Sequence, residues 1–192
     1  MARSFSEEEK VNIREKLIKE CEKSWTTIGY KKTKIDELCS KVGISKGAFY
    51  VFFDSKEHLF CRVFDIFQER HKALEETLPT APTKEDISHL LKQLYLEYDK
   101  THILSQRNSP DFISFLNRAP KDWIEKSQKI SENFIADNIF NPNLKLKMSK
   151  EKTIGIINAL LAILTSKDVL CYNDHFEVFC TLLDSVIDEI YE

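Results

Sequence analysis

The stretch GISKGAFYVFFDSKEHLF, residues 43–60, combines two lysines with five aromatic residues. It carries Lys46 beside two residues without bulk, Gly47 and Ala48. A helix that began here would expose free N–H groups and a partial positive charge at its N-terminus, and both favour a phosphate group. Tyr50 adds a hydroxyl at the end of a rigid side chain. We therefore interpret this stretch as a surface that contacts an anionic backbone, held in place by its other aromatic residues.

The surrounding residues predict a helix-turn-helix motif. A helix over 33–42, a glycine-containing turn and a second helix over 45–52 follow one another, which is the generic pattern of this motif. Ser45 can cap the second helix. Phe49 and Phe53 are four residues apart, so we expect them to face inward. A helix of two turns is marginal alone and needs such packing.

Further candidate phosphate contacts flank the motif. Thr33 and Lys34 begin its first helix and can reach the same nucleic-acid backbone. Lys56 lies in the first turn of the next helix, where a cation is unfavourable to the helix dipole. An external anion would explain a lysine at that position.

Helical periodicity extends through nearly the whole chain, which has only four glycines and five prolines. Capping boxes are expected at Ser6, Thr33 and Thr83, each followed three residues later by an acid. The segment 78–86 is rich in proline and threonine and is the clearest connection. The expected helices cover about 6–28, 33–42, 45–52, 56–77, 83–100, 110–118, 120–140, 149–170 and 174–191, with a shorter piece around 103–107. The sequence therefore predicts an all-α fold.

Composition excludes several classes of protein. No apolar run reaches the roughly 18 residues that span a bilayer, and the first ten residues lack the apolar region of a signal peptide. The five cysteines are odd in number and never spaced as CxxC, which favours reduced thiols in a cytoplasmic protein over disulfides or a zinc site. We expect no membrane contact, no cofactor and no metal. Residues 1–56 carry a net charge of +3 and residues 57–192 a net charge of −6, a weak indication of an anionic partner near the N-terminus.

The run T-x-x-x-x-L-C-x-x-V-G-I-S-K-G-A-F-Y-V-F-F-D-S-K-E-H-L-F, residues 33–60, resembles the DNA-binding domain of the tetracycline-repressor (TetR) family. Trp25, Gly29 and Tyr30 fit the end of that family's first helix. The resemblance implies a homodimer in which residues 1–56 form a three-helix helix-turn-helix domain that binds operator DNA. Residues 57–192 would then form a helical effector-binding and dimerisation domain. The DNA contacts that it implies are Thr33, Ser45, Lys46, Gly47, Tyr50 and Lys56.

One departure from the family pattern concerns the two positions after Tyr50. They are the apolar Val51 and Phe52, where many members carry polar residues. Apolar groups in the major groove can touch a thymine methyl group. Alternatively, Phe52 packs inward and the helix reads fewer bases. We expect Lys46, Ala48 and Val51 at base edges, with Lys34 among the backbone contacts.

Two apolar helices are expected at the C-terminal end. The helix over 149–170 is apolar nearly all round, and the helix over 174–191 carries an apolar stripe, so both need cover on several sides. They are either the core of one chain or a four-helix interface with a second copy. A homodimer is favoured, because a palindromic operator needs two recognition helices about 34 Å apart.

Aromatic residues between 91 and 135 are candidates for lining an effector pocket. Such a lining would suit a small apolar or aromatic effector, although a core role is the alternative. The candidates are Tyr95, Tyr98, Phe112, Phe115, Trp123 and Phe134.

Enzyme motifs are missing from the sequence: it has no G-x-S-x-G, no HExxH and no glycine-rich phosphate loop. We expect no catalytic activity. The expected function is sequence-specific DNA binding by a transcriptional regulator, a repressor released from a palindromic operator by a small molecule. The alternative is a ligand-binding or protein-interaction module whose N-terminal domain no longer binds DNA. Salt-dependent binding to a duplex separates the two.

Overall fold

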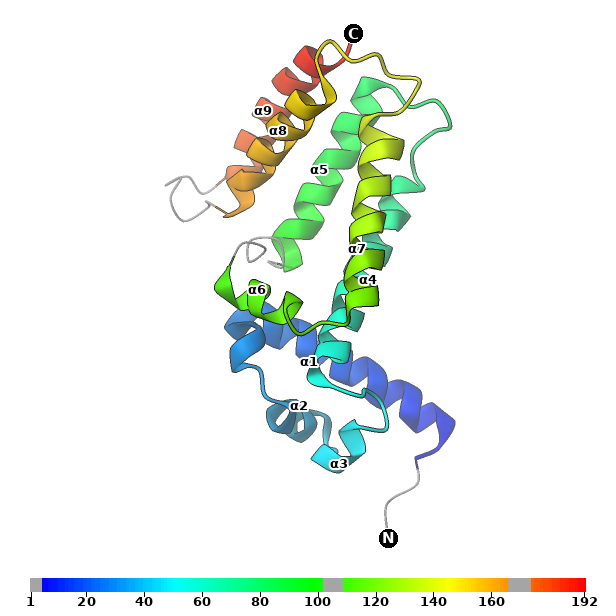
Figure 1. The fold of residues 1–192 in the computed structure, drawn as a ribbon, viewed down its shortest axis with the longest axis vertical. Helices are drawn as coiled ribbons and strands as arrows, with labels where there is room; N and C mark the ends of the chain where they lie inside the picture. Colours follow the sequence, from blue (N-terminus) through cyan, green and yellow to red (C-terminus); the bar gives the residue numbers. More distant parts are fainter. Residues whose placement is uncertain (1–4, 102–108, 166–173) are drawn as a thin grey trace. The chain divides into compact units, whose positions relative to one another are not determined.

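A computed structural model describes residues 5–101, 109–165 and 174–192. Within these ranges every regular element is a helix, apart from one antiparallel bridge between Leu146 and Tyr191, so the predicted all-α fold is confirmed. By packing, the described residues form two compact units. We call residues 5–68 and 109–126 the head unit, and residues 69–101, 127–165 and 174–192 the body unit. Figure 1 shows the helices of both in the order of the chain.

The head unit contains three complete helices from the N-terminal part of the chain and one from much later. They are α1 (Glu7–Lys32), α2 (Ile35–Val42), α3 (Lys46–Phe49) and α6 (Pro110–Leu116), joined by the first part of α4 (Lys56–Glu75) and the start of α7 (Lys121–Phe134). Trp25 of α1 is fully buried at its centre. Ring centroids of Phe60 and Phe115 lie 4.8 and 5.2 Å from that of Trp25. Aromatic packing therefore makes α6 part of the core that supports α1.

Two of the three predicted capping boxes are confirmed. The Ser6 hydroxyl accepts from the Glu9 N–H at 3.1 Å, and the Ser6 N–H donates to the Glu9 carboxylate at 2.9 Å. Thr83 and Asp86 make the same pair of bonds. The box predicted at Thr33 is wrong. The helix α2 begins at Ile35 without a side-chain cap, because the Thr33 hydroxyl donates to the Gly29 carbonyl at 2.7 Å instead.

The helix after the glycine turn, α3, is shorter than the predicted span of 45–52. Only Lys46–Phe49 is α-helical, and the chain then continues as a turn. In that turn the Val51 N–H donates to the Ala48 carbonyl at 3.1 Å, and the Phe52 N–H donates to the Phe49 carbonyl at 2.9 Å. These bonds span three residues, one fewer than in an α-helix, so the chain turns more tightly here. Phe52 and Phe53, the two residues after Val51, are both buried.

The body unit contains the rest of α4 and α7 and four further helical segments besides one short 3-10 turn. These are α5 (Lys84–Thr101), a π-helical turn (Ile135–Ile139) that extends α7, α8 (Lys150–Leu161) with its 3-10 turn (Ala162–Thr165), and α9 (His175–Ile190). Helices α8 and α9 run side by side, and α5 packs against α9 (Figure 1). Apolar side chains from α5 and α9 form most of the fully buried core, including Tyr95, whose ring stacks on Phe179 at 4.1 Å.

Two sequence predictions extend beyond the described residues: the piece around 103–107 and the end of the helix over 149–170. The functional boundary after residue 56 stays a prediction. Packing divides the chain elsewhere, since α6 and the first residues of α4 belong to the head unit. No helix within the described ranges is long and apolar enough to cross a membrane.

Candidate nucleic-acid interface

The turn between α2 and α3 depends on Gly43. This residue has φ 79° and ψ 32°, a left-handed conformation that glycine adopts without a Cβ penalty. Its N–H donates to the Cys39 carbonyl at 2.9 Å, and the Ile44 N–H donates to the same carbonyl at 3.0 Å. These bonds close α2 as a helix C-terminus and start α3 two residues later. The predicted helix-turn-helix is therefore present (Figure 1).

Ser45 caps the N-terminus of α3 as predicted. Its hydroxyl accepts from the Ala48 N–H at 3.2 Å, which satisfies one of the free donors of the first turn. Gly47 has open surroundings, because an added Cβ would meet only the Ser45 hydroxyl, at 3.9 Å. The start of α3 thus remains accessible to an approaching backbone.

The last residue of α3 and the residues after it divide between surface and core. Tyr50 is half exposed and Val51 is 62% exposed. Phe49, Phe52 and Phe53 are buried. The open question about Phe52 is thereby answered: it packs inward, with its ring 5.8 Å from that of Phe5. Of the two apolar residues after Tyr50, Val51 is the exposed one, and its contact with a base stays a prediction.

The two candidate lysines of the motif each have an acidic neighbour. Lys46 Nζ lies 3.0 Å from Asp36 Oδ2, and Lys34 Nζ lies 3.2 Å from Glu37 Oε1. The hydrogen bond and the charge of Asp36 raise the pKa of Lys46 above its ordinary value, so this lysine stays cationic. All four side chains are more than half exposed, and such pairs exchange readily for another anion.

Thr33 and Lys56 have internal roles that the sequence did not indicate. Thr33 is 2% exposed. The ammonium group of Lys56 donates to the Tyr30 carbonyl at 2.5 Å and lies 4.1 Å from the centre of the Tyr30 ring. Burial lowers the pKa of Lys56. These contacts explain a cation in the first turn of α4 without an external anion, so a phosphate contact by Lys56 stays a prediction with less support.

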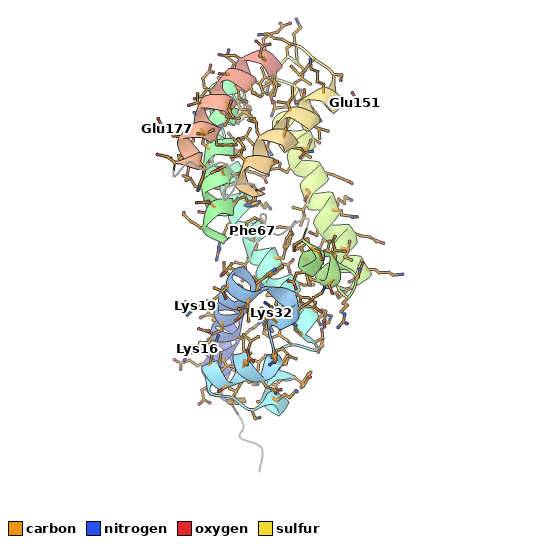
Figure 2. All side chains as sticks on the ribbon, turned by 90° about the vertical axis from the view of Figure 1, so that its left-hand side faces the viewer. Lys16, Lys19, Lys32, Phe67, Glu151 and Glu177 are labelled. Atoms are coloured by element: carbon orange, nitrogen blue, oxygen red, sulfur yellow. The ribbon has the colours of Figure 1, made fainter. Side chains whose placement is uncertain are left out.

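Arg14 positions the interface and was missed from the sequence. Its guanidinium donates to the Phe52 carbonyl at 2.8 Å and stacks 4.5 Å above the Phe53 ring. The side chain of Arg14 therefore supplies a hydrogen-bond donor to the backbone carbonyl at the end of the turn that follows α3. No sequence signal indicated this role, because Arg14 and Phe52 are far apart in the chain. Lys16 and Lys19 of α1, both labelled in Figure 2, are exposed and add positive charge to the head unit.

The six candidate pocket residues fall into two groups. Phe112, Phe115 and Trp123 belong to the aromatic core of the head unit, where the Trp123 ring lies 5.6 Å from Phe115. Tyr95, Tyr98 and Phe134 pack in or against the core of the body unit. Their role as effector contacts stays a prediction. In the described ranges, no group of three or more His, Cys, Asp or Glu is arranged to hold a metal ion.

Together, a glycine turn, a capped short helix and a buried aromatic anchor define a helix-turn-helix protein of the DNA-binding class. Comparison with known proteins agrees. The sequence profile described as "Bacterial regulatory proteins, tetR family" matches residues 17–63. The uncharacterized HTH-type transcriptional regulator YhgD of Bacillus subtilis is 32% identical over 129 residues, covering 66% of this chain and 67% of that protein. The regulator YdgC of the same organism is 31% identical over 158 residues, covering 78% and 80%.

The chain belongs to the TetR family, as its motif predicted, and is a DNA-binding transcriptional regulator. Regulators of this family bind operator DNA and form dimers, and the family is not one of enzymes. The fold also matches the crystal structure of the regulator FadR from Bacillus subtilis in complex with stearoyl-CoA, with a TM-score of 0.65. The match covers 92% of this chain and 98% of that one at 15% identity, so it establishes the fold alone.

Proposed function

We propose that this chain is a homodimeric repressor that binds a palindromic operator through α3 and leaves it when a small molecule binds the body unit. The observation that carries the DNA-binding part is the two-sided geometry around α3. Lys46, Tyr50 and Val51 are exposed, while the phenylalanines between and after them hold the segment on the head unit. Polar residues at the backbone and small or apolar residues at base edges are the two kinds of contact that a reader of DNA needs.

The proposed backbone contacts are those of the exposed turn and of the first helix. Lys34, Lys46 and Tyr50 would meet phosphates, with the open helix start at Ser45 and Gly47 beside them. Ala48 and Val51 would lie at base edges, together with Lys46. Thr33 and Lys56 would act mainly by supporting the motif from within, as their burial and their bonds to residues 29 and 30 suggest.

The proposed dimer uses the outer faces of α8 and α9. Most of the predicted apolar stripe on α9 is core, since Phe179, Leu183 and Ile187 are buried within the body unit. Beside this buried stripe, Leu182 stays 44% exposed. On α8 an added Cβ at Gly155 would meet no atom within 4 Å, so a second helix could approach it closely.

The proposed effector is a small apolar or aromatic molecule. Support comes from the aromatic side chains of the body unit and from the fold match to FadR, whose structure holds stearoyl-CoA. Helix α4 contributes residues to both units and is the proposed route from effector to DNA. Such a molecule releases DNA only if it binds the two conformations of the protein with unequal affinity.

The test is binding of the purified full chain to fluorescent duplexes from its own upstream region, titrated with salt. The expected result is selective binding to one duplex with a steep loss of affinity as salt rises. Lys46→Ala should lower that affinity and reduce the salt slope by about one unit. Equal, weak binding to every duplex at all salt concentrations would contradict the proposal and favour a module that has lost DNA binding.

The dimer and effector parts have separate readouts. Leu182→Arg should shift the mass in light scattering from dimer to monomer, with Thr181→Arg on the same helix as the matched exposed control. A wild-type chain that is monomeric at working concentration would contradict the dimer. Screening apolar and aromatic molecules for release of the labelled duplex tests the effector. If no compound changes operator affinity or thermal stability, the effector part of the proposal fails while the DNA-binding part stands.

A further inference from the structure

The first helix of the chain breaks at Gly29 before the helix-turn-helix begins. Gly29 has φ 81° and ψ 174°, a combination available essentially to glycine alone. The break lies just before the N–H groups of Tyr30 and Lys31, which donate to an acceptor outside α1. A turn over residues 29–33 then follows, in which the Thr33 N–H donates to the Gly29 carbonyl at 3.2 Å. This turn leads directly into α2.

Asp111, the second residue of α6, supplies the missing acceptors. The Tyr30 N–H donates to Asp111 Oδ2 at 2.5 Å, and the Lys31 N–H donates to Asp111 Oδ1 at 2.9 Å. A carboxylate that accepts two backbone N–H groups acts as a helix cap supplied from another part of the chain. Both partners belong to the head unit.

The absence of a side chain at Gly29 allows both the turn and the contact with Asp111. A Cβ on Gly29 would lie 2.6 Å from Asp111 Oδ2, closer than packed atoms tolerate, and 3.1 Å from its Cγ. Any larger residue would therefore displace the carboxylate as well as strain the backbone. The glycine before Tyr30 thus permits the close approach of α6.

Tyr30 also bonds to the start of α4, the helix that follows the helix-turn-helix motif. Its carbonyl accepts from Lys56, the first residue of α4, and its hydroxyl bonds to the Glu57 carboxylate. Tyr30 therefore contacts the start of α4, which follows α3, and it lies just before α2. Asp111 connects Tyr30 to α6. Both ends of the segment that presents α3 have fixed positions only while this junction holds.

We propose that Asp111 is a positioning residue for DNA recognition: through the amides of Tyr30 and Lys31 it sets the direction in which the chain leaves α1 for α2. Asp111 lies far outside the motif in sequence and touches no DNA. It keeps the helix-turn-helix in the orientation that binds its operator, and without it the binding-competent orientation is one of several. The inference rests on DNA binding by the chain and is independent of any effector.

The experiment compares three full-length variants with the wild type. Asp111→Asn keeps one carbonyl acceptor but turns an NH2 donor toward a backbone N–H, and Asp111→Ala removes both acceptors. Gly29→Ala disturbs the same contact from its other side. Asp122→Asn is the matched control, because Asp122 is an exposed aspartate near the start of α7 in the same unit.

Two readouts decide the outcome. Hydrogen exchange on the free protein should show faster exchange at Tyr30 and Lys31 in the Asp111 variants, with the amides around Leu17 unchanged. Affinity for the operator duplex should fall about tenfold, because only the fraction of correctly oriented molecules binds, while affinity for a scrambled duplex stays within about twofold. The Asp122→Asn control should match the wild type in both.

The inference is overturned if operator affinity is unchanged although the two amides exchange faster. It is also overturned if both duplexes lose affinity equally, which would indicate general damage. Should Asp111→Ala fail to fold, Asp111→Asn carries the same decision. If the wild type binds no duplex selectively, the proposed function fails. If only the Asp111 variants lose selectivity, the proposed function stands and the inference is supported.

Discussion

Lys46 Nζ lies 3.0 Å from Asp36 Oδ2, so an acid of α2 holds the cation that begins α3. Both side chains are more than half exposed, so the pair contributes little to stability and can separate. When DNA approaches, Lys46 must exchange this carboxylate for a phosphate. The exchange lowers the net gain from the lysine and places a negative charge close to the DNA backbone.

Asp36→Asn should therefore strengthen DNA binding. Exposed pairs contribute little, so the gain should be about two- to fivefold for operator and scrambled duplexes alike at low salt. The measurement is a fluorescence titration with both duplexes. Glu15→Gln, an exposed acid of α1 with the same charge change, is the control and should have a smaller effect. Weaker binding by Asp36→Asn would mean that Asp36 orients Lys46 for the operator.

Tyr50→Phe should weaken operator binding without changing stability. The hydroxyl belongs to a half-exposed side chain, while its ring packs edge-on against Phe49 at 5.4 Å and remains in the variant. Losing one phosphate hydrogen bond should cost about three- to tenfold in affinity. Titration of the operator duplex together with thermal unfolding checks both parts. Full operator affinity in Tyr50→Phe would remove the hydroxyl from the list of contacts.

Phe115→Ala should unfold the head unit more easily, whether or not an effector exists. Phe115 is fully buried among Trp25, Phe60 and Trp123, and its removal leaves a cavity. The expected loss is about 3–5 kcal/mol in the free energy of unfolding. Ile113→Ala on the same helix is the control, because Ile113 is 49% exposed and should change stability by less than about 1 kcal/mol. Equal losses in a urea titration would contradict the core assignment.

The stability of the body unit should depend on pH through His71. Burial lowers the pKa of His71 from 6.5 to about 4 in the folded chain. Between these values the unfolded chain binds a proton that the folded chain does not, so the free energy of unfolding rises with pH. The contribution is complete above pH 6.5 and is lost as the pH falls toward 4. It amounts to roughly 3 kcal/mol.

His71→Gln should flatten that dependence. Urea unfolding at several pH values between 4 and 7, compared between variant and wild type, isolates the histidine from other titrating groups. His89→Gln, at an exposed histidine on α5, is the matched control for the substitution. A slope in His71→Gln equal to that of the wild type would show that His71 titrates alike in both states.

The DNA-binding motif could be read from residue order because its signals are local. Gly43 closes a helix, Ser45 caps the next, and spacing of four places Phe49 and Phe53 on one side. Each depends on neighbours within a turn of the chain, so periodicity and capping chemistry predict it. Capping boxes at Ser6 and Thr83 were predicted for the same reason, and the family followed from the motif.

Other features were decided only by the tertiary structure. The direction of Phe52 depends on a ring near the start of α1, and the partners of Lys56 depend on where Tyr30 lies in space. The sequence predicted Thr33 as a helix cap, but its hydroxyl donates to the carbonyl of Gly29, where α1 breaks. In each case the side chain contacts a group that patterns of neighbouring residues cannot locate.

The sequence by itself determined the all-α class, the helix-turn-helix and the family, because helix periodicity, caps and a glycine turn act over a few residues. The tertiary structure decided which aromatic residues support the head unit and which belong to the body unit, and it brought Asp111 to the amides of Tyr30 and Lys31. Such contacts join segments that are remote in the chain. Their geometry follows from how whole helices pack, and no local pattern records it.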